Sequence, residues 1–297
     1  MRVIYLLLLT LFAGLAQAQV YIFGDSLSDT GNLASIQGNF PNPPFYNNRV
    51  SNGPVAVETL AQLLGGSANA SLYLTGPEQG TNYSVAGATA GGERPIDLLT
   101  QVGAFLQNHA GAAPADNVYV IFIGGNDVRG ARDNADYFAG RKSLTAAVSK
   151  VNTAAHMLLA AGAKKLMFVN VPDIGSIPET KLLAAAKQDW LLTYKASDLT
   201  RNYNRKLREI VENLEKEQNA DYVYFDLFSE FNHLLSDASA LGYTVTDSAC
   251  FSSQTFQFNA SCQYGQAFDQ HVFFDEIHPS AITHKRAGWA MAAQAPK

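Results

Sequence analysis

Five short runs of apolar residues, rich in β-branched and aromatic side chains, constrain the fold of this chain more than any other feature. Most of them are nearly continuous rather than alternating, which is typical of strands covered on both faces. Helical patterns lie between them. Strands that alternate with helices predict an α/β fold, with a parallel sheet between two layers of helices. The runs cover residues 20–23, 83–86, 118–123, 166–171 and 222–227.

Two amphipathic helices are expected between these runs. In the first, apolar residues recur at intervals of three and four from Leu144 to Leu159, and Gly162 follows as a helix-ending residue. The second covers about residues 199–215, with its apolar positions on one side. No internal repeat, low-complexity linker or break in composition divides the chain, so residues 19–297 are expected to form one domain.

The N-terminus has the pattern of a secretory signal. Arg2 supplies a positive charge, residues 3–15 are largely apolar, and small residues at 16 and 18 provide a cleavage site. The apolar segment is too short to span a bilayer comfortably. We therefore expect residues 1–18 to be a signal peptide cleaved near Ala18, and the mature chain to be secreted or periplasmic. The alternative is a retained N-terminal anchor.

Charge and cysteine content narrow the chemistry. The formal net charge is −5 and no basic block is present, so nucleic acid is not expected as a partner. Cys250 and Cys262 are the only cysteines, and in an exported chain they are expected to form one disulfide that closes a short loop. The sequence has no CxxC or HExxH motif, which disfavours a thiol redox site or a zincin-type metal site.

Glycine and polar residues follow three of the expected strands. The first strand is followed by GDS (residues 24–26), the second by GAT (87–89) and the third by GGND (124–127). In parallel sheets, functional sites form beyond the carboxyl ends of the strands. One such turn alone would be ordinary turn chemistry, but three together indicate a shared site. Gly24 is expected to give the backbone room to turn Ser26 toward that site.

Ser26 could serve as the nucleophile of acyl transfer, which also needs a base and a group that orients the base. His278 is the best candidate base because Asp275 precedes it by three residues on a short loop. Asp275 could accept a hydrogen bond from one imidazole nitrogen and leave the other nitrogen free to take the Ser26 proton. The alternatives are a polar turn at Ser26 and a helix-capping turn at His278. Four other histidines lie in helical patterns: His109, His156, His233 and His284.

Asn126 could complete the site as an oxyanion donor. Its side-chain amide donates hydrogen bonds and does not titrate. Together with the backbone N–H groups of Ser26 and Gly87, it would form a three-donor oxyanion hole. The alternative is an Asn-Asp turn that closes the third strand. Asp25 and Asp127 are expected to be structural.

Four stretches in this order resemble the GDSL esterase/lipase family, also called SGNH hydrolases. They are FGDSLSDTGN, NYSVAGATA, IGGNDV and DEIHPS. The resemblance is to the secreted branch of esterases, phospholipases, lecithinase/haemolysin-like proteins and glycerophospholipid acyltransferases. It implies a three-layer α/β/α fold of flavodoxin-like type and a metal-independent ester hydrolase without a cofactor. It also implies Ser26 as nucleophile, His278 as base and Asp275 as acid, with oxyanion donors at Ser26, Gly87 and Asn126.

Two other classes of function are compatible with these residues. One is a metal-dependent phosphoesterase, because several hard ligands follow the strands: Asp25, Asp29, Asp127, Asp275 and His278. The other is a non-catalytic binding module, since a fold does not fix a function. The motif content favours the serine hydrolase. Within that class, a hydrolase and an acyltransferase share one acyl-enzyme.

The expected substrate is a lipid-like or short-chain acyl ester. The protein is expected to be a monomer and to make transient contact with a membrane or micelle surface. An aromatic, proline-rich loop follows Ser26 and could line an acyl pocket or hold a choline headgroup; its aromatic residues are Phe40, Phe45 and Tyr46. The loop between Cys250 and Cys262 is expected to border the mouth of the site. The alternatives are ordinary loop packing and a surface staple.

Overall fold

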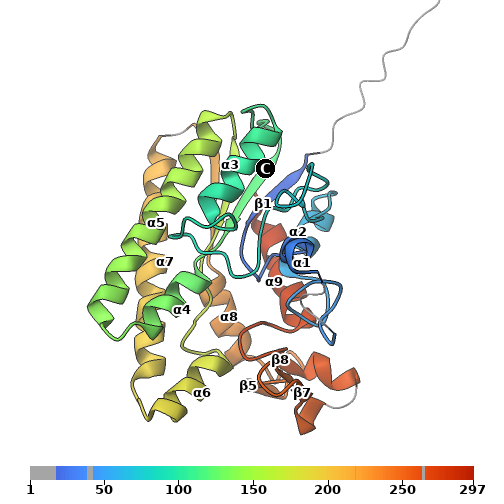
Figure 1. Ribbon diagram of the computed structural model, residues 1–297, viewed down its shortest axis with the longest axis vertical. Coiled ribbons are helices and arrows are strands. Elements are labelled where there is room, and N and C mark those ends of the chain that lie inside the picture. Colours follow the sequence, from blue (N-terminus) through green and yellow to red (C-terminus); the bar gives the residue numbers. More distant parts are fainter. Residues whose placement is uncertain (1–17, 39–42, 218, 263–264) are drawn as a thin grey trace, which may run out of the picture.

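The computed structural model describes residues 18–38, 43–217, 219–262 and 265–297. Its centre is a parallel four-stranded sheet in the order β1-β2-β3-β4 (Figure 1). Pairing is regular from end to end, so that the carboxyl ends of all four strands lie at one edge. The strands are β1 (Val20–Gly24), β2 (Val118–Phe122), β3 (Lys165–Val169) and β4 (Asp221–Phe225).

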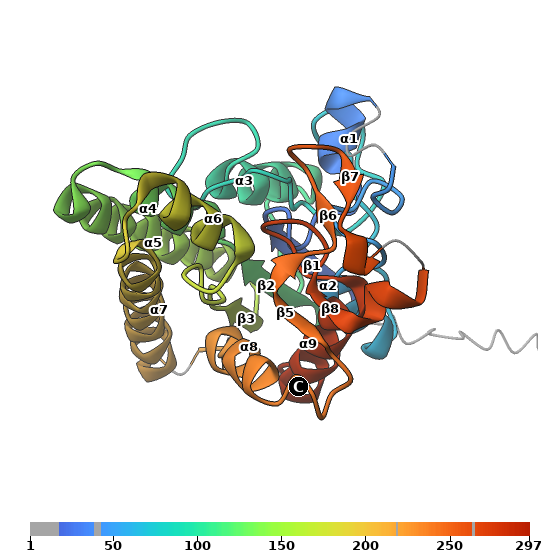
Figure 2. The same cartoon turned by 90° about the horizontal axis from the view of Figure 1, so that it is seen from below.

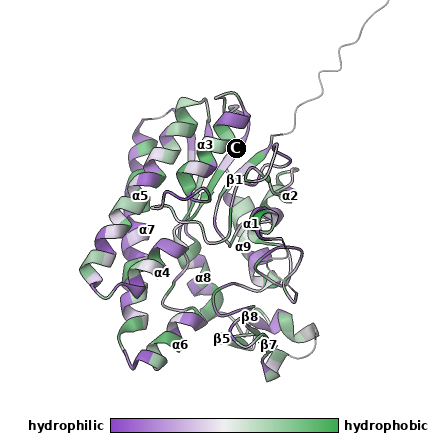
Figure 3. Cartoon of the chain, viewed as in Figure 1, coloured by the Kyte–Doolittle hydropathy of each residue, from purple (hydrophilic) through white to green (hydrophobic). Residues whose placement is uncertain are grey.

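Helices cover both faces of the sheet. Alternate side chains of each strand point to opposite faces, and each face has its own hydrophobic core. Helices α3 (Leu98–Asn108), α5 (Tyr137–Ala160) and α7 (Leu192–Lys216) pack on one face, and α2 (Ala56–Leu63) and α9 (Ala281–Gln294) on the other. Figure 3 shows the green, hydrophobic strands between these layers. The expected three-layer α/β/α fold is therefore confirmed.

The remaining helices lie around the carboxyl edge of the sheet or close to the first strand. They are α1 (Asn32–Gln37), α4 (Gly125–Asp133), α6 (Pro178–Lys187) and α8 (Leu227–Ser236). Both helices expected from periodicity are present, as α5 and α7. Gly162 follows α5 at a φ of +111°, the left-handed region that favours glycine.

The strand expected at residues 83–86 is not a regular strand. Residues 81–85 run along the free edge of β1 and make three backbone hydrogen bonds with it, at 3.1, 2.8 and 3.2 Å. The ladder is interrupted at Gly24, whose N–H donates to the Gln101 Oε1 at 2.8 Å and not to this segment. Counting this segment as a second strand, the spatial order becomes 2-1-3-4-5, the flavodoxin-like order.

A small unit near the C-terminus was not expected from the sequence. Strand β5 (Val245–Ala249) pairs with β8 (His271–Phe273), and β6 (Phe251–Ser252) pairs with β7 (Gln257–Phe258). Two 3₁₀ helices, η1 (Ala260–Cys262) and η2 (Gly265–Gln270), connect these pairs. Cys250 and Cys262 are joined as a disulfide beside a cluster of phenylalanines. Across the ranges that the structure describes, no helix is both long and apolar enough to cross a membrane.

Candidate active site

Three side chains from opposite ends of the chain meet beyond the carboxyl edge of the sheet. Ser26 follows β1, and Asp275 and His278 lie on the loop between β8 and α9. The Nε2 atom of His278 is 2.8 Å from the Ser26 Oγ. Its Nδ1 atom is 2.9 and 2.8 Å from the two carboxylate oxygens of Asp275. The Asp–His pair and the serine are therefore placed as the sequence predicted.

The spacing of three between Asp275 and His278 has a local cause. The Asp275 Oδ1 accepts hydrogen bonds from the backbone N–H groups of Ile277 and His278, at 2.8 and 2.6 Å. These bonds form a tight turn that returns the imidazole to its own carboxylate. Both side chains are buried, so the carboxylate fixes the orientation of the ring and favours the tautomer with its proton on Nδ1.

Asn126 lies in the first turn of α4 and lines the same cavity as Ser26 and His278. One Nδ2 proton is used in a 2.9 Å bond to the Ala88 carbonyl, which leaves the second proton for a ligand. Gly87 is the residue before Ala88, and its φ of +82° lies in the left-handed region that favours glycine. The guanidinium of Arg94 donates to the Gly87 carbonyl at 2.7 Å and helps to hold the loop.

The loop that carries Gly87 is held by carboxylates. Asp29 accepts the N–H of Ala86, as well as three N–H groups at the start of α1. Asp127 accepts the N–H groups of Ala90 and Gly91, at 2.8 Å each. These bonds give Asp127 the structural role expected of it. The same hydrogen bonds engage the carboxylates of Asp29 and Asp127, two of the ligands considered for a metal site.

The metal-site alternative therefore lacks a ligand cluster in the part of the chain that is described. There, the only group of three side chains close enough to share an ion is Cys250, Cys262 and His271. Its two sulfur atoms are already joined as the disulfide.

Gly24 has a different role from the one expected. A Cβ at this position would lie 2.5 Å from the Phe122 carbonyl oxygen on β2. Glycine is thus required for the close approach of two strands, and not to turn Ser26 toward the site. Gln101 fixes the same residue from α3, because its side-chain amide bonds both the N–H and the carbonyl of Gly24 at 2.8 Å. Sequence reasoning missed Gln101, since a helical glutamine carries no distinguishing signal.

A cavity of about 280 Å³ opens at Ser26 and His278. It continues between α8, α9 and the segment that precedes α6. Its walls are mostly apolar, with branched and aromatic side chains that include Ile174, Ile177, Leu227, Phe231, Leu234 and Ile277. His233 and His284, which the sequence assigned only to helices, also line it. Such a wall suits an acyl chain.

The aromatic loop after Ser26 does not form this cavity. Neither Phe45 nor Tyr46 lines it, and Phe40 lies outside the described residues. Phe45 instead packs edge-on against Phe251 and Phe274, with ring centroids 5.6 and 5.3 Å apart. For Phe45 the alternative of ordinary loop packing therefore holds, because its ring is partly buried against the phenylalanine cluster beside the disulfide.

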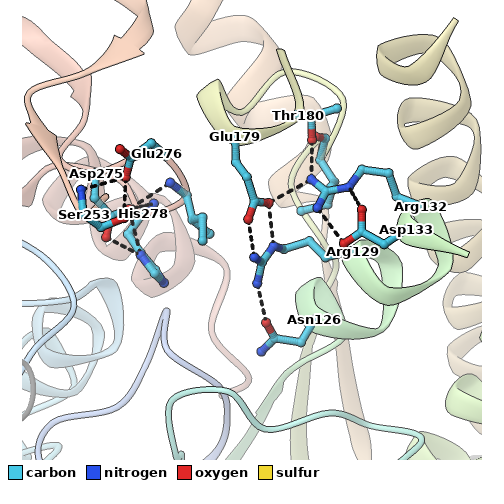
Figure 4. A network of polar contacts seen from close by, with 12 residues as sticks. Asn126, Arg129, Arg132, Asp133, Glu179, Thr180, Ser253, Asp275, Glu276 and His278 are labelled. Atoms are coloured by element: carbon cyan, nitrogen blue, oxygen red, sulfur yellow. Dashed lines mark hydrogen bonds and ion pairs between the residues drawn. The ribbon is translucent and has the colours of Figure 1, made fainter. Parts of the chain in front are cut away.

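The disulfide loop does not line the cavity either, contrary to expectation. It contacts the loop of Asp275 and His278 from outside. The backbone N–H and hydroxyl of Ser253 bond the Glu276 carboxylate at 3.1 and 2.7 Å. Figure 4 shows this contact next to Asp275 and His278.

Two buried titratable groups, Asp25 and His284, lie close to Ser26 and His278. Burial raises the pKa of Asp25 to about 6, although the Leu27 N–H and the nearby His278 act in the opposite direction. Burial lowers the pKa of His284 to about 3, so its imidazole is neutral at neutral pH. The Nδ1 atom of His284 accepts the Ala56 N–H at 3.3 Å.

Replacing Asp25 by asparagine should stabilise the protein at high pH. The folded-state pKa is above the unfolded value, so folding opposes ionisation, and wild-type stability falls as the pH rises from about 4 through 6. A difference of about two units corresponds to roughly 3 kcal/mol. The variant keeps an acceptor for Leu27. Urea unfolding should show a gain of up to about 3 kcal/mol at pH 8 and little change at pH 4. An equal effect at both pH values would contradict the assignment.

A second polar network holds Asn126 from α6 (Figure 4). Arg129 donates to the Asn126 Oδ1 at 3.1 Å and to the Glu179 carboxylate at 2.9 and 2.5 Å. Arg132 donates to the same carboxylate at 2.8 Å. Burial opposes ionisation of Glu179, but the two arginines outweigh it and hold its pKa below the usual range. The Glu179 N–H also donates to the Glu276 carbonyl at 2.8 Å, so Glu179 links Asn126 to the loop of Asp275.

Replacing Arg129 by methionine should lower kcat about tenfold, because Asn126 loses the bond that orients its amide. The double-mutant cycle with Asn126→Ala is the control. Once Asn126 is absent, the Arg129 change should cause no further loss in kcat. Additive losses in the cycle would show that Arg129 acts independently of Asn126.

Comparison with known proteins places this site in a family. A family model described as GDSL-like lipase/acylhydrolase matches residues 20–291. The chain is 27% identical over 238 residues to the phosphatidylcholine-sterol acyltransferase of Aeromonas hydrophila, covering 80% of this chain and 66% of that protein. It is 28% identical over 290 residues to the thermolabile hemolysin of Vibrio parahaemolyticus, covering 90% and 61%. A catalytic mutant of an acetylxylan esterase from Geobacillus stearothermophilus aligns with a TM-score of 0.46 at 16% identity, covering 94% and 92%.

The chain belongs to the GDSL-like lipase/acylhydrolase family, because the family model spans most of its length. It is accordingly a carboxylic ester hydrolase, as the resemblance of the four stretches predicted. The chain spans about two thirds or less of the length of the acyltransferase and the hemolysin. The activities in their names therefore bear on this chain only as proposals.

Proposed function

We propose that the protein hydrolyses lipid-like or short-chain carboxylic esters through an acyl-enzyme on Ser26. The observation that carries the proposal is the 2.8 Å contact between the Ser26 Oγ and the His278 Nε2, with Asp275 on the other imidazole nitrogen. A serine, a base and a group that orients the base are the requirements of nucleophilic acyl transfer.

The chemistry follows from this arrangement. His278 accepts the Ser26 proton at Nε2 while the Oγ attacks the ester carbonyl. The negative charge that develops on the carbonyl oxygen is stabilised by the free Nδ2 proton of Asn126 and by the N–H groups of Ser26 and Gly87. His278 then returns the proton to the departing alkoxide, which leaves as an alcohol. A water molecule repeats the sequence on the acyl-enzyme and releases the carboxylic acid.

The apolar cavity next to Ser26 supports an acyl chain as the bound part of the substrate. Transfer of the acyl group to an alcohol instead of water is the second candidate. It is favoured by the similarity to the Aeromonas phosphatidylcholine-sterol acyltransferase. The two activities differ only in the nucleophile that attacks the acyl-enzyme.

A substrate panel tests the proposal. It runs from p-nitrophenyl esters of graded chain length to lysophosphatidylcholine, with and without an added long-chain alcohol. We expect hydrolysis with kcat/KM rising as the chain fills the cavity. Ester product formed in the presence of the alcohol would identify the acyltransferase. Absence of turnover on every ester by folded protein would overturn the proposal.

Export of the protein is proposed on the signal pattern at residues 1–18 and on the disulfide between Cys250 and Cys262. N-terminal sequencing of protein recovered outside the cytoplasm should give a start near Gln19. An intact N-terminus on that fraction would contradict cleavage.

A further inference from the structure

Large apolar side chains are exposed where α6 turns into α7. Leu182 is 53% exposed, Trp190 84%, Leu191 60% and Tyr194 66%. We call these four residues the α6–α7 tip. Single exposed apolar residues are common, but several aromatic and aliphatic side chains together on one short segment mark an interaction site.

The α6–α7 tip lies at the same end of the molecule as the catalytic residues. In Figure 1, the connection between α6 and α7 and the β6–β7 turn both project at the lower end, beyond the carboxyl ends of the strands. Seen from below in Figure 2, α6 and the β6–β7 pair lie on either side of the strand ends. The β6–β7 turn carries a further exposed aromatic, Phe256, at 74%.

The tip is also close to the cavity along the chain. Ile174 and Ile177 line the cavity immediately before α6 begins at Pro178. The N–H of Glu179 is bonded to the catalytic loop at the Glu276 carbonyl. Helix α6 therefore connects the tip directly to the segment that lines the cavity.

Charge at the tip differs from the rest of the chain. Residues 181–195 contain three lysines and one acidic residue, whereas the whole chain has a formal net charge of −5. Lys181 and Lys187 are exposed, and Lys195 pairs with Asp189 at 3.0 Å. Tryptophan, tyrosine and leucine flanked by lysine are the residue types that favour the boundary between lipid headgroups and acyl chains. Anionic headgroups add attraction for the lysines.

We propose that the α6–α7 tip binds the surface of a phospholipid bilayer or micelle containing anionic lipid, and holds the cavity over that surface. The inference rests on the proposed function as a hydrolase of lipid-like esters. It assigns the aromatic side chains to the headgroup layer and the lysines to the phosphates. A lipid surface is favoured over a protein partner because exposed aromatic and aliphatic side chains occur together with exposed lysines on one short segment of an otherwise acidic chain.

The first experiment measures binding without catalysis. The chain has two tryptophans, so Trp289→Phe leaves Trp190 as the only tryptophan, which can be excited selectively at wavelengths that tyrosine does not absorb. Vesicles of phosphatidylcholine and phosphatidylglycerol in equal parts should shift its emission to the blue. In sedimentation with these vesicles, Trp190→Ser/Leu191→Ser should bind about tenfold more weakly than the parent. The matched control is Leu63→Ser, which changes a side chain that is 55% exposed near the opposite edge of the sheet.

The second experiment compares rates on soluble and vesicular esters. The double variant should hydrolyse a soluble p-nitrophenyl ester at the parental rate and vesicular phospholipid about tenfold more slowly. If the parent binds vesicles but does not hydrolyse the soluble ester, the proposed function is contradicted and the inference about vesicle binding is not. Unshifted Trp190 emission, or equal sedimentation of parent and double variant, would overturn the inference. So would a dimer of the parent that the double variant abolishes, since a second copy would then occupy the tip.

Discussion

Replacing Ser26 by alanine is expected to lower kcat by about 10⁴–10⁶-fold, because no other group can form the acyl-enzyme. The loss should be seen with any ester that the parent hydrolyses, in a continuous assay with p-nitrophenyl esters. Among the described residues, His278 is the one side chain that bonds the Ser26 Oγ, so the fold should be unaffected.

Thermal unfolding of the Ser26→Ala variant provides the control, and its Tm should match that of the parent. A folded variant that keeps more than about one hundredth of the parental kcat would rule out Ser26 as the nucleophile.

Replacing Asp275 by asparagine is expected to lower kcat about 10⁴-fold. The asparagine oxygen can still accept the N–H groups of Ile277 and His278, so the turn should persist. The amide nitrogen, however, would face the His278 Nδ1 and stabilise the wrong tautomer. The imidazole would then present a proton to Ser26 instead of an acceptor.

The matched control is Glu276→Gln, which changes the next carboxylate on the same buried loop. The Glu276 carboxylate bonds Ser253, whereas the His278 imidazole bonds Asp275 and Ser26, so this variant should stay within a few-fold of the parent. Comparable losses in the two variants would show that Asp275 acts only by folding the loop.

The layers of the fold could be predicted because strands that are buried on both faces need apolar side chains at nearly every position. Residues 20–23, 118–123, 166–171 and 222–227 are continuous or nearly continuous apolar runs, and each contains or overlaps a strand of the sheet. Residues 83–86 lie at an edge of the sheet, where the Gly24 N–H bonds the side chain of Gln101 and not this segment. Composition reports burial, and it does not report where the hydrogen bonds go.

The meeting of Ser26 with the Asp275–His278 pair could be predicted, because these residues lie in short motifs that follow a strand or occupy one turn. The supporting network could not, because Gln101 and Glu179 lie outside those motifs and have no distinguishing pattern in the sequence. Gln101 is 77 positions from Gly24, and Glu179 is 50 positions from Arg129. The acyl cavity was misplaced for the same reason, since its walls come from α8, α9 and the segment before α6. Aromatic residues close to Ser26 in sequence were a poor guide to its surroundings in space.

Peptide mapping after labelling with a fluorophosphonate tests the central claim most directly. Such a reagent reacts with a serine whose proton is removed by a neighbouring base. The account predicts one adduct per chain, on the peptide that contains Ser26, together with loss of esterase activity and no labelling of the Ser26→Ala variant. An active enzyme that remains unlabelled, or an adduct on another residue with activity lost, would contradict it.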